Sequence, residues 1–264
     1  MGSMNRCSEF AAKLASGDVL AGIFQKFQTH QAVELISFSA MDFVVLDAEH
    51  APFDASQIDA SLLASKAYDV PMLVRVPRNE PDTILSVLDM GANGIFVPHV
   101  RSPEDAAKAV RASRYKGGNR GFSPSTRAGG YGDYGHSAYM SEADRTITVV
   151  LQIEDTEALN HLDEIAAIEG VGGLFVGRAD LAVSMNLDWN DRQLDDATLA
   201  IAAAARKAGV AAGSYLADTS RLPEFLDLGV NFYLIGSDQG AMKQQVRGMA
   251  KTFHDLAAAW EKDK

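Results

Sequence analysis

The sequence predicts an α/β protein with a single domain, a (β/α)8 or TIM barrel that spans residues 1–264. Three observations predict this fold. Short apolar runs rich in β-branched residues recur along the chain, segments with helical periodicity lie between most of them, and there are eight such runs. Eight strands that alternate with helices favour a closed parallel barrel over an open, doubly wound sheet. No glycine-rich dinucleotide motif follows the first run, which also argues against the open sheet.

The predicted strands and helices alternate along the chain. The strands cover residues 20–24, 43–47, 72–76, 94–98, 148–154, 173–177, 212–217 and 231–236. The helical segments include residues 56–68, 81–90, 103–115, 156–168 and 197–208. Several of these segments open with a proline or an N-cap residue, and Gly91, Gly170 and Gly209 follow a segment end, which is typical of helix termini.

One connection is too long for a simple crossover. Residues 116–145 are rich in Gly, Ser and Tyr and show little helical pattern. A stretch of this length without secondary structure is usually functional or disordered. Disorder fits less well here, because three tyrosines and a phenylalanine are available to pack the segment against the rest of the protein. We therefore predict a long active-site loop.

The charge and composition of the chain exclude some classes of partner. The formal net charge of −11 disfavours nucleic acid and anionic membrane surfaces, since both need basic patches. No apolar run approaches the roughly 20 residues that span a bilayer, and no secretory signal is evident. The single cysteine, Cys7, fits a reducing compartment, so we expect a cytoplasmic protein. Residues 1–3 resemble a cloning remnant, with Met4 as the expected native start.

Polar residues gather where the predicted strands end. In a parallel barrel the active site lies at the carboxyl ends of the strands, so polar side chains there indicate chemistry. The second strand, for example, ends abruptly in three ionisable groups within four residues. The polar residues at or just after strand ends are Asp47, Glu49, His50, Arg75, His99, Gln152, Glu154, Arg178 and Asp180.

Two of these residues are candidate metal ligands. Glu154 and Asp180 follow neighbouring strands. Two carboxylates, together with waters and a substrate oxygen, suit a hard divalent cation such as Mg²⁺ or Mn²⁺. The alternative is that Glu154 caps the helix expected to begin at Thr156.

Arg75 and His50 are candidate catalytic residues. Arg75 lies inside an otherwise apolar strand, and buried arginine is rare unless it is paired, so a carboxylate substrate is a natural partner. His50 is a candidate general base if Asp89, from the neighbouring βα unit, fixes its tautomer. His99 has no evident partner, and capping or loop packing explains it and His136 better.

The distribution of lysine argues against one mechanism. No lysine lies within a predicted strand, and only Lys26 lies near the expected catalytic end of the barrel. A mechanism through an imine needs a desolvated lysine amine. The sequence therefore favours the metal-dependent route.

Six motifs together carry a family resemblance. They are DAEH at 47–50, LVRVP at 73–77, LDMGANGIFVPHV at 88–100, RGFSPSTRAGGYG at 120–132, LQIED at 151–155 and GLFVGRADLA at 173–182. In this order, and over nearly the whole chain, the set resembles the HpcH/HpaI aldolase family, the metal-dependent class II pyruvate aldolases. The resemblance implies a (β/α)8 barrel that assembles as a hexamer, a trimer of dimers, with a C-terminal helix exchanged between partners.

The resemblance also implies roles for individual residues. Glu154 and Asp180 would bind Mg²⁺, Mn²⁺ or Co²⁺, Arg75 would hold the pyruvyl oxygens, and His50, oriented by Asp89, would move protons through a water. The residues expected to bind substrate are Arg75, Gln152, Arg178, Ala179, Asp180 and Tyr215. Arg178 departs from the family pattern, in which proline is usual, and could bind an acceptor carboxylate or point into a subunit interface.

The chemistry of these residue types fits an aldolase. A 2-keto acid can chelate a cation that stabilises its enolate while a carbon–carbon bond breaks or forms. We therefore expect cleavage or formation of 4-hydroxy-2-oxo acids from pyruvate and an aldehyde. The alternatives are a decarboxylase of oxaloacetate-like acids, a CoA-thioester lyase of the citrate lyase β branch, and a non-catalytic barrel scaffold.

Overall fold

The computed structural model describes residues 6–263 and contains a closed barrel of eight parallel strands within that range. The strands pair in sequence order, and β8 pairs with β1 to close the barrel. Their bounds are β1 Leu20–Gln25, β2 Phe43–Asp47, β3 Met72–Arg75, β4 Gly94–Val97, β5 Thr148–Ile153, β6 Gly173–Val176, β7 Ala211–Leu216 and β8 Phe232–Ser237. The predicted (β/α)8 fold is confirmed. Residues 1–3 and Met4, the expected native start, lie outside the described residues.

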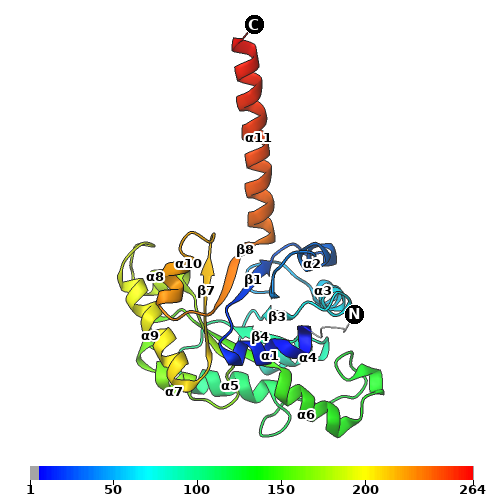
Figure 1. Ribbon diagram of the computed structural model, residues 1–264. Coiled ribbons are helices and arrows are strands. Elements are labelled where there is room, and N and C mark those ends of the chain that lie inside the picture. The colour runs from blue at the N-terminus through cyan, green and yellow to red at the C-terminus, as the bar shows by residue number, and fades with distance from the viewer. Residues whose placement is uncertain (1–5, 264) are drawn as a thin grey trace.

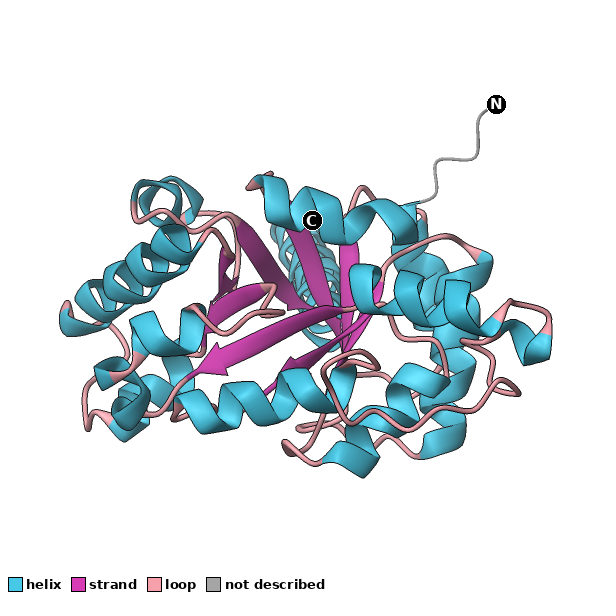
Figure 2. Ribbon diagram, turned by 90° about the horizontal axis from the view of Figure 1, so that it is seen from below, coloured by secondary structure: helices cyan, strands magenta, loops and turns pink. Residues whose placement is uncertain are grey.

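Helices surround the strands (Figure 2). The helices and 3-10 turns of the described residues are α1 Arg6–Ser16, α2 His30–Ser37, α3 Ala55–Ala67, α4 Pro81–Asp89, α5 Pro103–Ser113, η1 Gly130–Gly132, α6 His136–Thr146, η2 Thr156–Asn160, α7 Leu162–Ala166, α8 Arg178–Ser184, α9 Gln193–Ala208, α10 Leu222–Asp227 and α11 Asp238–Lys262. The last of these, α11, projects away from the barrel as a single long helix (Figure 1). No helix of residues 6–263 combines the length and the apolar character needed to cross a bilayer.

Aromatic side chains fill the interior of the barrel. Rings from alternate strands, β4, β6 and β8, contact one another, with Phe96 and Phe175 at 4.8 Å and Phe175 and Phe232 at 5.8 Å between centroids. Glycine makes room for them, because a Cβ at Gly213 would lie 2.3 Å from the Phe232 ring. Helix α1 closes the amino end of the barrel, where Phe10 lies 5.3 Å from Phe43. The interior is therefore packed, and a ligand can enter only at the carboxyl ends.

Each end of the predicted strands agrees with the observed one to within one residue, while the helices agree less well. The segment predicted as one helix over 156–168 is a 3-10 turn, η2, followed by the short helix α7. Helix α9 begins at Gln193 rather than at residue 197. The strands are easier to predict because each is a short run of buried apolar residues, whereas a helix end depends on capping contacts.

The segment over residues 116–145 is not a structureless loop beside the active site of its own chain. It contains η1 and α6 and connects α5 to the start of β5, so it lies at the amino ends of the strands, where α6 packs near α1 (Figure 1). Arg120 pairs with Asp89, and Arg127 pairs with Asp59. The segment can serve an active site only if that site belongs to another subunit.

Candidate active site

The carboxylate of Asp47 lies between two cations at the carboxyl ends of β2 and β3. Asp47 and Arg75 are paired in the strand register, and the Arg75 guanidinium donates from Nε to Oδ1 at 2.9 Å and from Nη2 to Oδ2 at 2.7 Å. Lys26 Nζ lies 2.8 Å from Oδ2. Burial alone would raise the pKa of Asp47, but the hydrogen bonds and charges of Arg75 and Lys26 lower it to about 2. The carboxylate stays ionised and fixes both cations.

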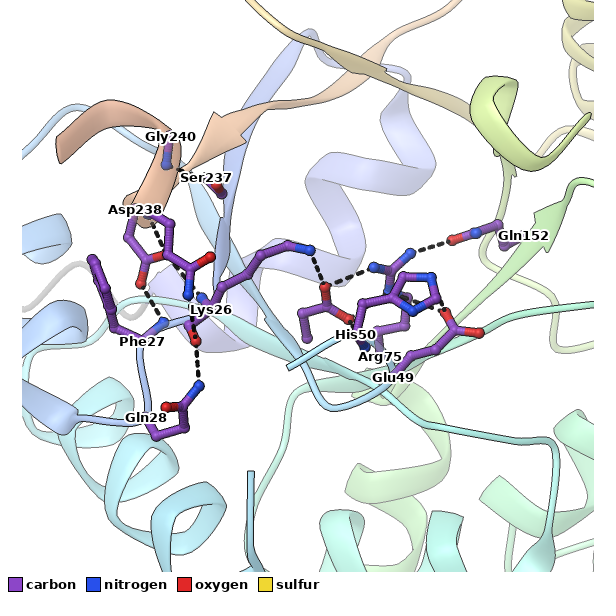
Figure 3. A network of polar contacts seen from close by, with 12 residues as sticks. Lys26, Phe27, Gln28, Glu49, His50, Arg75, Gln152, Ser237, Asp238 and Gly240 are labelled. Carbon is purple, nitrogen blue, oxygen red and sulfur yellow. Dashed lines mark hydrogen bonds and ion pairs between the residues drawn. The ribbon is translucent and has the colours of Figure 1, made fainter. Parts of the chain in front are cut away.

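The Arg75 guanidinium is held on several sides, as Figure 3 shows. Besides Asp47, it donates from Nη1 to Gln152 Oε1 at 3.4 Å, and its Nε lies 3.4 Å from Glu49 Oε2. Its carbon centre lies 4.6 Å from the centroid of the Phe24 ring. This cation is therefore pre-organised at the floor of the barrel mouth. A substrate carboxylate was the expected partner of Arg75, but the carboxylate of Asp47 in the same chain already pairs with it.

Glu49, His99 and Glu154 form a cluster that could hold a metal ion, with one ligand atom of each within 4.8 Å of the others. His99 Nδ1 lies 3.4 Å from Glu154 Oε1, and His99 Nε2 lies 3.7 Å from Glu49 Oε1. The backbone of His99 has a left-handed φ of 53°, and its amide donates to Glu154 Oε1 at 2.8 Å. The expectation that His99 has no partner is wrong, because its partners follow other strands and are distant in the sequence.

Glu154 does not cap a helix. Residue Asp155 occupies the N-cap position of η2, while the Glu154 carboxylate accepts hydrogen bonds from the His99 amide and from Gln152 Nε2. A Cβ at Gly177 would lie 2.8 Å from Glu154 Oε2, so only glycine lets the turn after β6 approach this carboxylate closely. That turn leads directly into Asp180 in the first turn of α8.

The carboxyl groups of this cluster have raised pKa values, as expected of a site that a divalent cation would stabilise. Burial raises the pKa of Glu49 to about 7, and it also raises the pKa of Glu154, which the charge of Asp180 raises further. Glu49 Oε2 is buried and has no hydrogen-bond partner among the described residues. Close, desolvated carboxylates repel one another, and a bound cation relieves that repulsion. The donor set of carboxylates with imidazole suits Mn²⁺ or Co²⁺, and its oxygens suit Mg²⁺.

A pocket of about 330 Å³ brings the predicted substrate-binding residues together. It is lined by His50, Arg75, Gln152, Arg178, Ala179, Asp180 and Tyr215, among others. A larger cavity, of about 950 Å³, lies at the opposite end of the barrel, between α1, α6 and the chain around Arg127. Of these two cavities, only the smaller one adjoins the arginine and carboxylate cluster. The smaller pocket is therefore the candidate site.

His50 stands at the exposed edge of the site, whereas Asp89 lies elsewhere. The His50 amide donates to Asp47 Oδ1 at 3.1 Å, and its Nε2 lies 3.8 Å from Glu49 Oε2. Burial and the charge of Arg75 lower the pKa of His50, which favours the neutral base at neutral pH. Asp89 ends α4, which runs back toward the amino ends of the strands, and it pairs with Arg120 at 2.9 Å. The predicted contact between Asp89 and His50 is not made within the chain.

The network also reaches the first turn of α11 (Figure 3). The Asp238 carboxylate accepts hydrogen bonds from the amides of Lys26 and Phe27, each at 2.9 Å. The Ser237 side chain caps the same helix by accepting from the Gly240 amide. The loop that carries Lys26 is therefore fixed from both sides, by Asp47 and by the start of α11.

Comparison with known proteins identifies the family. The sequence model of the HpcH/HpaI aldolase/citrate lyase family matches residues 20–244, which is most of the chain. The chain belongs to this family. It is 34% identical over 249 residues to the 5-keto-4-deoxy-D-glucarate aldolase of Salmonella paratyphi A, a match that covers 93% of this chain and 96% of that protein.

Two crystal structures extend the comparison. A HpcH/HpaI aldolase/citrate lyase family protein from Burkholderia cenocepacia J2315 has a TM-score of 0.88 at 29% identity, over 94% of this chain and 99% of that one. The citrate synthase SbnG has a TM-score of 0.85 at 28% identity, over 94% and 98% of the two chains. The predicted family is confirmed, and with it the class of enzymes that form or break carbon–carbon bonds.

The buried carboxylate of Asp47 provides a test of this arrangement. Asp47→Asn should lower the free energy of unfolding at pH 7 by about 3–5 kcal/mol, because it removes the charge that compensates Arg75. The measurement is urea unfolding followed by circular dichroism. Asp54→Asn, a change at an exposed helix cap, is the control and should leave the free energy of unfolding close to that of wild type, since asparagine caps a helix about as well as aspartate.

The cost of Asp47→Asn should also depend on pH. The pKa of Asp47 in the folded protein lies below the ordinary value of 3.8. The stabilisation by the carboxylate is therefore complete above about pH 4 and is lost as the pH falls toward about 2. The unfolding curves of wild type and variant should converge over that range. A difference in stability that is the same at pH 7 and at about pH 2.5 would contradict this account.

Proposed function

We propose that this protein is a divalent-metal-dependent aldolase that cleaves or forms 4-hydroxy-2-oxo acids through the enolate of pyruvate. The observation that carries the proposal is the Arg75 guanidinium, which lines the pocket and is fixed by Asp47 next to Glu49, a member of the cluster of Glu49, His99 and Glu154. The family membership fixes the general class of reaction. The position of Arg75 supports the binding of a keto acid at this pocket.

In this proposal Glu154 and Asp180 hold the metal ion, and Glu49 and His99, which cluster with Glu154, are further donors. The ion would supply Lewis acidity that stabilises negative charge on the keto oxygen of the substrate. Arg75 binds the carboxylate and keto oxygens of pyruvate, since its fork is already oriented by Asp47. Gln152 fixes the orientation of both Arg75 and Glu154.

His50 is the proposed acid and base. For cleavage, a base must take the proton of the substrate's 4-hydroxyl group, and the neutral imidazole of His50 lines the pocket at its exposed edge. Lys26 is unsuited to an imine mechanism, because its amine is engaged by the Asp47 carboxylate at 2.8 Å. A decarboxylase of oxaloacetate-like acids would use the same enolate site and stays the second candidate.

The surface of α11 supports the proposed assembly into a homo-hexamer. Six large apolar side chains recur on this helix at alternating spacings of four and three residues, and all are exposed: Met242, Val246, Met249, Phe253, Leu256 and Trp260. A stripe at this spacing is the pattern of a helix that packs against a partner. We propose that α11 docks on a second copy of the chain, as in an exchanged helix.

Removal of the metal tests the proposed function. Treatment with a chelator should abolish aldol cleavage, because the enolate then lacks its compensating charge. Addition of Mg²⁺, Mn²⁺ or Co²⁺ should restore the activity. Glu154→Gln and Asp180→Asn should weaken Mn²⁺ binding measured by calorimetry, whereas Glu164→Gln, at an exposed carboxylate of α7, is the control. Full activity of rigorously metal-free protein with both pyruvate-derived substrates and oxaloacetate would rule the proposal out.

Replacement of His50 tests its role in proton transfer. His50→Ala should lower kcat by about 10²- to 10⁴-fold, the usual loss for a general base, with Mn²⁺ affinity unchanged. His161→Ala, a change at another exposed histidine, should leave kcat as it is in wild type. If His50→Ala loses its metal but turns over normally once metal is supplied in excess, His50 is a ligand or a structural residue instead.

Charge on the apolar stripe tests the proposed assembly. Phe253→Glu combined with Leu256→Glu should lower the mass of the particle in sedimentation equilibrium, since two carboxylates would be buried at the docking surface. Gln244→Glu, on the opposite side of the same helix, is the matched control. An unchanged mass for the double variant would show that α11 does not hold the subunits together.

A further inference from the structure

Lys26 is a cation at the catalytic face that the proposed chemistry does not use. It follows directly after β1, and its Nζ lies 2.8 Å from Asp47 Oδ2. Its side chain is 24% exposed, but Lys26 is not among the residues that line the pocket. Lys26 therefore acts on a bound substrate through its neighbours rather than by direct contact.

Lys26 and Arg75 contact the same carboxylate oxygen. Arg75 Nη2 donates to Asp47 Oδ2 at 2.7 Å, and this is the oxygen that Lys26 also contacts. Both cations lie against one aromatic ring, since the guanidinium centre of Arg75 and Lys26 Nζ are 4.6 Å and 5.8 Å from the centroid of Phe24. In Figure 3 the side chain of Lys26 extends toward Arg75. Lys26, Asp47 and Arg75 thus form one charged unit.

The net charge of this unit depends on Lys26. Asp47 and Arg75 alone form a neutral pair, whereas the three groups together carry one net positive charge. The side chains of Asp47 and Arg75 are 0% and 7% exposed, so water screens their charges only weakly. A substrate carboxylate at Arg75 therefore meets a net positive charge when Lys26 is present, and only the dipole of an ion pair when it is absent.

The acidic groups beside Arg75 make this positive charge necessary. Arg75 Nε lies 3.4 Å from Glu49 Oε2, and Glu49 clusters with His99 and Glu154. These carboxylates repel an anion that binds to Arg75 unless further positive charge offsets the repulsion. Lys26 supplies such a charge without occupying any part of the pocket.

The loop that carries Lys26 is fixed independently of Asp47 (Figure 3). The amides of Lys26 and Phe27 donate to the two oxygens of Asp238, each at 2.9 Å, and the Lys26 carbonyl accepts from Gln28 Nε2 at 2.6 Å. Because the backbone is already ordered from the side of α11, contact with Asp47 restricts only the rotamers of the Lys26 side chain. The ion pair therefore costs less conformational entropy than one made by a lysine on a mobile loop.

We infer that Lys26 is a positioning residue for substrate binding: it shares the Asp47 carboxylate and so leaves Arg75 with positive charge for the carboxylate of a 2-oxo acid. The inference rests on the proposed aldolase function. Lys26 takes no part in the making or breaking of bonds. Loss of its charge therefore weakens the binding of the keto acid equally in the ground state and in the transition state, which raises KM and leaves kcat unchanged.

The kinetic test measures exchange of the pyruvate methyl protons with deuterated water in the presence of Mg²⁺, which reports enolate formation without any aldehyde. Lys26→Met, which keeps the length of the side chain but removes its charge, should raise KM for pyruvate by about 10- to 100-fold, the scale of a lost contact to a charged group. Its kcat should stay within about twofold of wild type. Lys26→Arg keeps the charge and should restore KM. Lys207→Met, which removes a lysine from an exposed ion pair with Asp163, is the control and should leave both constants unchanged.

A second measurement does not depend on turnover. In calorimetry with the Mn²⁺-loaded protein, oxalate, an anion that resembles the pyruvate enolate, should bind at least about 10-fold more weakly to Lys26→Met than to wild type. Mn²⁺ itself should bind Lys26→Met at least as tightly as wild type, because the loss of a nearby cation does not oppose the binding of another. Weaker binding of both ligands would show a distorted site. That result, or unchanged oxalate affinity, would overturn the inference and leave Lys26 as a structural partner of Asp47.

The inference and the proposed function can fail separately. Wild-type protein that neither exchanges the pyruvate methyl protons nor adds an aldehyde contradicts the proposed function. If wild type exchanges these protons and Lys26→Met does so with the same KM, the inference alone is contradicted. A lower kcat with an unchanged KM also contradicts it, because Lys26 would then act in the chemical step.

Discussion

The buried carboxylate of Asp47 is the interaction on which the rest of the site depends. Arg75 contacts both of its oxygens, and Lys26 contacts Oδ2. Oδ1 also accepts a hydrogen bond from the amide of His50. Burial of a charged group costs free energy of folding unless the charge is paired, so the removal of any one of these groups would destabilise the others. The strand register puts Asp47 directly beside Arg75. The barrel itself therefore fixes the orientation of the guanidinium.

A second group of charges lies beside this pair and has the opposite character. Glu49 and Glu154 are close, mostly buried and only partly compensated by His99, and burial raises the pKa of both carboxyl groups. The Asp47 carboxylate is compensated within the chain by Arg75 and Lys26, whereas a bound cation would relieve the repulsion in the second group. This division fits the proposed reaction, in which Arg75 binds the carboxylate of the substrate and the second group supplies oxygen ligands for a metal ion.

The two ends of the barrel have different tasks. Chain direction sends every strand end to the catalytic face and every helix end back to the opposite face, which is why Asp89 and the segment over 116–145 lie away from His50. At the catalytic face, the start of α11 holds the Lys26 loop through Asp238. The rest of that helix projects away from the barrel (Figure 1) and carries the exposed apolar residues. In the proposed assembly, the helix that fixes this active-site loop would also dock on a second copy of the chain, so the order of the site would depend on assembly.

The sequence by itself determined the alternation of strands and helices, and with it the barrel and the end of the barrel at which the chemistry takes place. Buried strands such as FVVLD can be recognised in the sequence because every residue in them is apolar until the polar end. The family motifs lie at those ends. Arg75, Glu154, Asp180 and His50 could all be named from these patterns. Tertiary structure alone decided which of these groups contact one another, because such contacts join residues from different βα units. The fold places His99 beside Glu154, Asp89 beside Arg120, and Arg178 and Arg221 on the same carboxylate. The closure of the barrel and the direction of each helix set those distances.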